Sequence, residues 1–200
     1  MLLADLLADP DTAIGPILRE SCSQLGRSLD LLSRVLHSPA PAELGPVSVR
    51  EPVQFINDLH DAGRTGARME VAIDPSVPAA AAIERHLEHA LLNLVLNSTS
   101  ALQSQEGGTI RITARNDGDQ VEIVVADNGP GLPPDVVAGL FGPTAAGGTG
   151  IRPPGVGLLV ASEVLRHSAG TLAYVPGSEP GARFVITLQR WRQETSHRER

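Results

Sequence analysis

The fold of this chain is indicated first by the stretch HALLNLVLNSTSAL, residues 89–102. Its apolar residues recur at helical spacing, and Asn93 and Asn97 are four residues apart, so both amide side chains project from one face of a helix. The residues expected to face the core are Leu92, Val95 and Leu96. Two amides at this spacing can present oxygen atoms to a hydrated Mg²⁺ and its phosphates, although the polar surface of an ordinary amphipathic helix gives the same pattern.

Strands and helices alternate around this helix, which the pattern extends over residues 80–104. Upstream, residues 47–73 predict a strand, a helix and a strand, and the residues predicted on one face of that helix are Val53, Phe55, Ile56 and Leu59. Downstream, the sequence predicts a helix at 157–168 and strands at 109–115, 121–127, 171–176 and 182–188. Together with a hairpin turn at 116–119, these elements predict an α+β fold, a two-layer sandwich of a mixed sheet packed on helices.

The Pro-rich segment SPAPAELGP, residues 38–46, separates two parts of the chain. The residues before it keep helical spacing over positions 1–37, and proline disrupts such a pattern. We therefore expect a helical segment at 1–40, a compact domain at 47–190 and a polar tail at 191–200.

Composition and charge limit the classes of partner. The net charge of -7 and the pI of about 5.3 argue against nucleic acid or an anionic membrane. The opening MLLADLLADP carries two aspartates and no basic residue, so it is typical neither of a signal peptide nor of a membrane span, and we expect a cytoplasmic protein. The single cysteine, Cys22, excludes an internal disulfide and a cysteine-based zinc site.

A strand rich in β-branched residues leads into ADNGPGLP, residues 126–133. A buried carboxylate at its end, Asp127, can accept a hydrogen bond from an exocyclic amine such as that of adenine. Gly129 and Gly131 let the backbone pass close to a purine ring. A simple strand-ending turn gives the same residues, so this motif gains meaning in combination with the others.

Two further glycine-containing stretches follow. Residues 142–165, GPTAAGGTGIRPPGVGLLVASEVL, run into a helix, and Gly155 and Gly157 stand where free backbone N–H groups and the helix dipole favour phosphate. The glycines are also typical of a mobile lid, but the GK[ST] element of a P-loop is absent. In EPGARFVITL, residues 179–188, Gly181 permits a tight turn into the last strand.

In this order, the four patterns resemble the Bergerat-fold (GHKL) ATPase superfamily of gyrase, the heat-shock-ninety chaperones, histidine kinases and MutL proteins. The N box is NLVLN, the first glycine box DNGPG, the second GVGL and the last GARF. Histidine kinases are the most similar branch, because their N box has two asparagines four apart. The hydrolytic branches have a glutamate at the position of Asn93, and asparagine cannot serve as that base. The resemblance therefore implies phosphoryl transfer rather than efficient ATP hydrolysis.

The resemblance also implies a role for each matching residue. Asn93 and Asn97 are the expected catalytic pair, with Asn97 as the ligand of Mg²⁺. Asp127 is expected to bind the adenine amine of ATP, next to Gly129 and Gly131. The second glycine box is expected to hold the triphosphate through Gly155, Val156, Gly157 and Leu158. Phe141 lies where kinases have the aromatic residue that hinges the ATP lid.

The expected partners follow from the same resemblance. The helix before residue 38 resembles the second half of the kinase dimerisation hairpin, which implies a homodimer, and a response regulator or a histidine-containing phosphoacceptor protein is the expected second partner. None of the six histidines has the context of a phosphoacceptor; His60, followed by Asp61, comes nearest but lies inside the predicted domain. The phosphoacceptor therefore lies either in a segment upstream of this sequence or in another protein.

Several positions depart from the kinase pattern. Thr144 and Ala145 stand where an aromatic residue and a lysine are usual, two prolines precede the second glycine box, and Ala182 replaces the usual threonine. These changes leave an alternative open, a kinase-like dimeric scaffold that binds ATP weakly or not at all.

Overall fold

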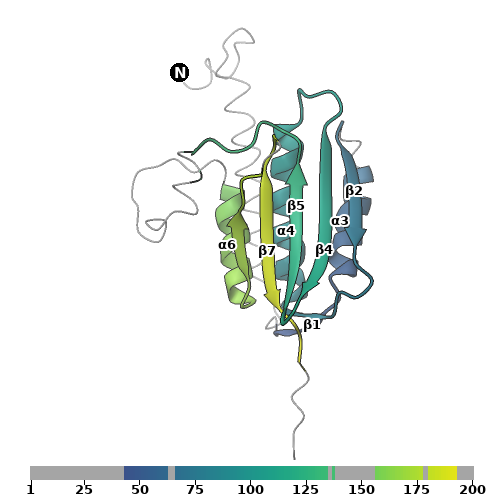
Figure 1. Cartoon of the computed structure of the whole chain (residues 1–200), viewed down its shortest axis with the longest axis vertical. Coiled ribbons are helices and arrows are strands. Elements are labelled where there is room, and N and C mark those ends of the chain that lie inside the picture. The colour runs from purple at the N-terminus through teal and green to yellow at the C-terminus, as the bar shows by residue number, and fades with distance from the viewer. Residues whose placement is uncertain (1–42, 63–65, 135–136, 138–155, 178–179, 193–200) are drawn as a thin grey trace, which may run out of the picture.

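The computed structural model describes residues 43–62, 66–134, 137, 156–177 and 180–192. Within them, a five-stranded mixed sheet packs against three helices (Figure 1). The helices are α3 (Arg50–Ala62), α4 (Glu84–Ala101) and α6 (Val156–His167). The strands are β1 (Gly45–Val47), β2 (Arg68–Ile73), β3 (Ala80–Ala82), β4 (Thr109–Asp117), β5 (Gln120–Asp127), β6 (Thr171–Tyr174) and β7 (Arg183–Gln189).

The main sheet has the strand order β2-β4-β5-β7-β6, and β1 pairs with β3 in a separate two-stranded sheet. β2 runs parallel to β4, whereas the other neighbours in the main sheet are antiparallel. The three helices lie behind the sheet in the view of Figure 1, and α4 contacts both other helices and the strands β4 and β5. This central position brings the C-terminal half of α4 next to the end of β5.

The core lies between the helices and one face of the sheet. The strands β4, β5 and β7 mostly alternate buried and more exposed residues with the period of two expected of a sheet that is covered on one face, except at Val124 of β5, which is also buried. The inward residues are Ile110, Ile112, Val121, Ile123, Val125, Phe184, Ile186 and Leu188. Burying one such side chain stabilises the fold by about 1.5–3 kcal/mol. The last residues of β5 are therefore anchored by the burial of Val125 in this core.

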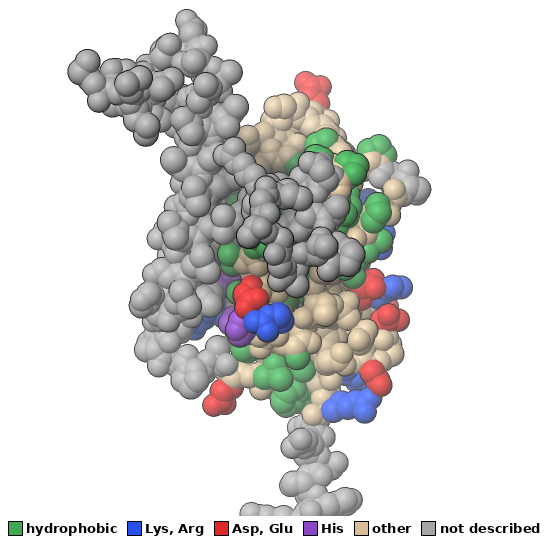
Figure 2. Space-filling view, turned by 90° about the vertical axis from the view of Figure 1, so that its left-hand side faces the viewer, with side chains coloured by type: hydrophobic (Ala, Val, Ile, Leu, Met, Phe, Trp, Pro, Cys, Tyr) green, Lys and Arg blue, Asp and Glu red, His purple; other side chains and the backbone are tan. Residues whose placement is uncertain are grey.

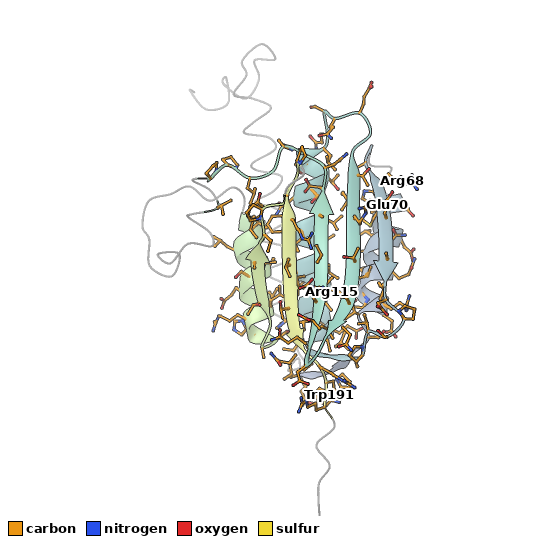
Figure 3. All side chains as sticks on the ribbon, in the orientation of Figure 1. Arg68, Glu70, Arg115 and Trp191 are labelled. Carbon is orange, nitrogen blue, oxygen red and sulfur yellow. The ribbon has the colours of Figure 1, made fainter. Side chains whose placement is uncertain are left out.

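The other face of the main sheet carries charged side chains. Arg111 donates from Nε and Nη2 to Oε2 of Glu70 at 3.1 and 3.0 Å, and Arg115 donates to Glu122 at 2.8 and 3.0 Å. Figure 3 shows Arg68 and Glu70 on β2 and Arg115 on β4. No helix in the described part of the chain covers this face. Each of these exposed ion pairs contributes at most about 1 kcal/mol to the stability of the fold.

Most predicted elements are present, but the long helix predicted at 80–104 is wrong at its N-terminal end. Residues 80–82 form β3 instead, because Ala80 pairs with Val47 and bridges to Arg190. The alanine run favours a helix, and long-range pairing overrides that weak preference.

The predicted apolar face of α3 is only half correct. Val53 and Ile56 are buried, whereas Phe55 is 53% and Leu59 46% exposed. The contacts of α3 are mainly with α4 and β2, so they cover a narrow stripe of its surface.

The predicted inward residues of α4 also need correction. Val95 is buried as expected, but Leu92 and Leu96 are only partly buried. Leu87, Leu91 and Leu94 are fully buried instead, because α4 is covered by helices on two sides as well as by the sheet.

The ends of the chain are described in part. The helical segment predicted at 1–40 lies outside the described residues, as does the tail beyond residue 192. The backbone N–H of Trp191 donates to the carbonyl of Ala79 at 2.8 Å, just below the sheet in Figure 3. The described helices include none with both the length and the apolar character needed to cross a membrane.

Candidate functional site

Asp127 is the last residue of β5, and its buried side chain is held by three hydrogen bonds. Oδ1 accepts the backbone N–H groups of Gly129 and Ala182 at 3.0 and 3.1 Å. Oδ2 accepts the hydroxyl group of Ser98, on α4, at 2.7 Å. Because each carboxylate oxygen can accept two hydrogen bonds, Oδ1 is fully used and Oδ2 retains one acceptor position.

A cavity of about 260 Å³ lies beside this carboxylate. Its polar groups come from α4 and the end of β5, and its apolar groups come from the segment after β5, from α6 and from β7. The lining residues are Asn97, Ser98, Ser100, Ala101, Asp127, Gly131, Leu132, Leu158, Ala182 and Phe184. An apolar hollow with a few fixed polar groups at one side is typical of a small-molecule site.

Two glycines allow the backbone segments around Asp127 to approach one another. Gly181 has φ of 131°, and a Cβ atom there would overlap the carbonyl oxygen of Asp127. Gly131 has φ of 76°, and its Cβ atom would lie 2.9 Å from the carbonyl oxygen of Gly181. Both backbone conformations are strained for other residues, so the cavity wall requires glycine at these positions.

The two asparagines of α4 lie next to the start of α6. Nδ2 of Asn93 donates to the carbonyl of His89 at 3.0 Å, which fixes the orientation of its amide. The position that a Cβ atom on Gly157 would take lies 3.1 Å from Oδ1 of Asn93 and 3.6 Å from both amide atoms of Asn97. Nδ2 of Asn97 is buried and has no hydrogen-bond partner among the described residues. A buried unsatisfied donor costs about 1–3 kcal/mol, so this atom points to a group that is supplied by a ligand.

The structure brings most of the predicted site residues together. Asn97, Asp127, Gly131 and Leu158 line the cavity, while Asn93, Gly129 and Gly157 lie next to Asn97 or Asp127. Val156 is the first residue of α6. Gly155 and Phe141, which were predicted to contact the triphosphate and to hinge the lid, lie outside the described residues, as do Thr144 and Ala145. His60 is buried on α3, with 8% exposure.

Ser98 was not predicted from the sequence. Successive helical residues project about 100° apart, so Ser98 does not share the face of Asn93 and Asn97, and their spacing gives no signal for it. The polar run NSTS at 97–100, within an otherwise apolar helix, is the sign that was available.

The opposite end of α4 contains a second buried hydroxyl group. Ser168, which follows α6 and is fully buried, accepts the backbone N–H of Ile83 at 3.2 Å, and its Oγ atom lies 3.2 Å from Nδ1 of His86. Burial lowers the pKa of His86, and the neighbouring His167 lowers it further. Figure 2 views the molecule from this side, where charged side chains and histidine gather around the end of α6. Glu163 forms an ion pair there with Arg166, and Nδ1 of His167 lies 3.6 Å from the Glu163 carboxylate.

Sequence comparisons match the chain to a known family. A family model described as "Histidine kinase-, DNA gyrase B-, and HSP90-like ATPase" matches residues 82–192. The chain is 27% identical over 188 residues to the sensory histidine kinase/phosphatase NtrB of Rhizobium leguminosarum bv. phaseoli, which covers 86% of this chain and 48% of NtrB. It is 29% identical over 189 residues to the sensor histidine kinase ZraS of Salmonella typhimurium, which covers 88% of this chain and 39% of ZraS. The chain therefore spans less than half the length of these two relatives.

Solved structures show the same fold. The catalytic domain of histidine kinase ThkA matches with a TM-score of 0.61 at 20% identity, over 74% of this chain and 96% of that chain. Full-length ShkA in complex with AMPPNP matches with a TM-score of 0.62 at 24% identity, over 93% of this chain and 41% of that chain. ThkA in complex with the response regulator protein TrrA matches with a TM-score of 0.65 at 17% identity, over 94% of this chain and 54% of that chain. The predicted α+β sandwich of the Bergerat type is thereby confirmed.

Proposed function

This chain belongs to the family of histidine kinase-, DNA gyrase B- and HSP90-like ATPases, and from this premise we propose that it is the catalytic core of a two-component sensor histidine kinase. In this proposal, the core binds ATP and transfers its γ-phosphoryl group to a histidine, from which a response regulator receives it. The kinase names of the relatives NtrB and ZraS and the kinase structures ThkA and ShkA support this assignment.

The unfilled hydrogen-bonding capacity at the cavity carries the proposal. Oδ2 of Asp127 keeps one acceptor position, and Nδ2 of Asn97 is a buried donor without a partner among the described residues. Both residues line a cavity whose apolar walls are formed by Leu132, Leu158 and Phe184. An adenine ring with its exocyclic amine fits this combination, because the apolar walls suit the ring and the carboxylate suits the amine.

The phosphate and Mg²⁺ subsites are assigned to the start of α6 and the facing asparagines. Asn97, with Asn93 beside it, would hold Mg²⁺ through amide oxygen, a ligand type that this ion prefers. The triphosphate would be held by Gly155, Val156, Gly157 and Leu158, where the N-terminal end of α6 favours anions. Gly129 would keep Asp127 oriented, and Phe141 would hinge the lid. When bound, Mg²⁺ supplies neutralisation of the phosphate charge.

The residues around the cavity favour transfer over hydrolysis. Asn93 is held by the carbonyl of His89, and a neutral amide at this position does not take a proton from water. Among the described residues that line the cavity, Asp127 is the one carboxylate, and three of its four acceptor positions are used within the chain. The core therefore contributes positioning, and the nucleophile comes from elsewhere.

The partners belong to the same proposal. The phosphoacceptor histidine would lie in a segment upstream of this sequence or in another protein, and residues 1–40 would form a helical homodimer interface. The response regulator is proposed by analogy with ThkA, which was solved in complex with TrrA. We assign the chain to the cytoplasm, where such a relay operates.

Titration calorimetry with a non-hydrolysable ATP analogue and Mg²⁺ tests the proposal. The unchanged chain should bind the analogue, and Asp127→Asn should weaken binding at least about tenfold, because it exchanges a charged acceptor for a neutral amide. The matched control is Asp119→Asn, which changes an exposed carboxylate on the hairpin and should leave the Kd unchanged.

Urea unfolding of both variants checks that each remains folded. If Asp127→Asn does not fold, Asn97→Leu provides the second test of the same cavity. Absence of binding to the unchanged chain up to millimolar nucleotide would overturn the proposal. It would favour the dimeric scaffold that the departures at Thr144, Ala145 and Ala182 suggest.

A further inference from the structure

Ser98 is almost completely buried, at 2% exposure, and its hydroxyl group contacts the carboxylate of Asp127. We propose that Ser98 is a positioning residue for the nucleotide base. Its hydroxyl group fixes the Asp127 carboxylate so that the remaining acceptor position of Oδ2 meets the exocyclic amine of an adenine nucleotide. This inference rests on the proposed function, because it assigns a role within the same nucleotide site.

The count of hydrogen bonds explains the role. The carboxylate has four acceptor positions, two on each oxygen. The backbone N–H groups of Gly129 and Ala182 fill both positions on Oδ1, at 3.0 and 3.1 Å. Ser98 fills one position on Oδ2 at 2.7 Å, a short distance typical of a hydroxyl group that donates to a charged acceptor. One acceptor position on Oδ2 remains, and the hydrogen bond from Ser98 determines the direction in which it points.

The hydroxyl group comes from α4 and not from the segment that enters β7. In the family pattern that the sequence resembles, position 182 is a threonine, but the alanine found here has no side-chain donor. Ala182 contributes only its backbone N–H to the carboxylate, while its side chain lines the cavity. Ser98 thus supplies, from another wall of the same cavity, a hydroxyl group that residue 182 lacks.

A positioning role differs measurably from a packing role. If Ser98 only packed α4 against β5, its loss would weaken the binding of every nucleotide by a similar factor. Oδ2 meets only a base that carries an exocyclic amine, so loss of the hydroxyl group should reduce the benefit of that amine specifically. Without its bond to Ser98, the carboxylate keeps both backbone hydrogen bonds on Oδ1, but the direction in which Oδ2 presents its acceptor positions is less fixed.

The experiment compares two ligands in four proteins. The ligands are a non-hydrolysable ATP analogue and the same compound with a purine base that has hydrogen in place of the exocyclic amine. The proteins are the unchanged 200-residue chain, Ser98→Ala, the conservative Ser98→Thr and the control Ser162→Ala, with Mg²⁺ present throughout. Ser162 is an exposed serine on α6 and is not one of the residues that line the cavity.

We expect the unchanged chain to prefer the amine-bearing ligand about tenfold or more. Ser98→Ala should reduce this preference to about threefold or less, while its Kd for the ligand without the amine changes little. Ser98→Thr should keep most of the preference, and Ser162→Ala should keep all of it. A Ser98→Ala/Ala182→Thr double variant should recover part of the preference, because it returns a hydroxyl group to another wall of the cavity.

The outcomes separate the two proposals. If the unchanged chain binds neither ligand, the proposed function fails. If it binds with the expected preference and Ser98→Ala has the same preference, only the role of Ser98 is overturned. If Ser98→Ala does not fold, Ser98→Val replaces it and is compared with Ser98→Thr, because the two side chains have similar shapes and only threonine carries a hydroxyl donor. Equal preferences in these two variants overturn the inference equally.

Discussion

The two ends of α4 use the same chemistry for different purposes. At the N-terminal end, the buried hydroxyl group of Ser168 joins the start of α4 to the end of α6 through Ile83 and His86. At the C-terminal end, the buried hydroxyl group of Ser98 joins α4 to the end of β5 through Asp127. In each case, a serine ties a helix to a neighbouring element from inside the core.

The two ends of α4 differ in whether hydrogen-bonding groups near the serine are left without a partner among the described residues. Ser168 is fully buried, and its hydroxyl group contacts the backbone N–H of Ile83 and Nδ1 of His86. Beside Ser98, an acceptor position of Asp127 and the donor Nδ2 of Asn97 have no partner in the part of the chain that the structure describes, and both residues line a cavity. A buried hydrogen bond alone therefore gives no reason to propose a binding site. The unfilled groups beside Ser98 are what support the proposed nucleotide site, since unsatisfied buried groups are costly.

The largest effect that should separate the two ends is that of Ser168→Ala. This change leaves the partly buried N–H of Ile83 without its partner and should lower the free energy of unfolding by about 1–3 kcal/mol. The Kd for the ATP analogue should stay within about twofold, because the change lies at the other end of α4. Urea unfolding and calorimetry measure both quantities, with the exposed Ser162→Ala as the control. A nucleotide defect as large as that of Ser98→Ala would show that the two ends are coupled.

A second change should act in opposite directions on stability and binding. Asn97→Leu replaces an amide with an unsatisfied buried nitrogen by an apolar side chain of similar size. The ligand-free protein should gain up to about 1 kcal/mol of stability, because the desolvation cost of the amide is removed. Binding of the Mg²⁺-nucleotide analogue should weaken at least about tenfold. A loss of stability without ligand would mean that Asn97 is satisfied within the chain and would weaken the contrast between the two ends.

The smallest expected effect concerns the dependence of stability on pH, through His86 at the N-terminal end of α4. The pKa of His86 lies below its ordinary value of 6.5, chiefly because of burial. The folded protein thus binds a proton at His86 less readily than the unfolded chain, so this contribution to stability is complete above pH 6.5 and is lost as the pH falls. The Tm of the unchanged chain should fall further between about pH 7.5 and 5.5 than the Tm of His86→Asn. Equal slopes in the two proteins would exclude His86 as a source of the pH dependence.

The sequence predicted the elements whose signals are local. The spacing of Asn93 and Asn97, the turn before Gln120 and the end of a strand at Asp127 are all present in the structure. Four of the predicted site residues do line one cavity, although their roles remain predictions.

The features that were missed depend on contacts between distant segments. Ala80 leaves the predicted helix because β1 and Arg190 pair with it. Phe55 is exposed because the helix layer ends at α3, and the sequence of α3 alone does not reveal that edge. The contact between Ser98 and Asp127 joins residues 29 positions apart, and helical spacing carries no information about such a pair.

Among the described residues, the main sheet ends in two edge strands, β2 and β6, and their character bears on the behaviour of the protein at high concentration. An unpaired edge strand is a template for the addition of a strand from another molecule, which is how ordered aggregates begin. The edge strand β6 is only four residues long, and the other edge strand, β2, carries the exposed charged residue Arg68 beside Glu70 (Figure 3). Short length and charge both oppose edge-to-edge pairing. These two features oppose association of a sheet that has one face uncovered by the described helices, and uncharged replacements of Arg68 and Glu70 would create an aggregation hazard without changing the cavity beside Asp127.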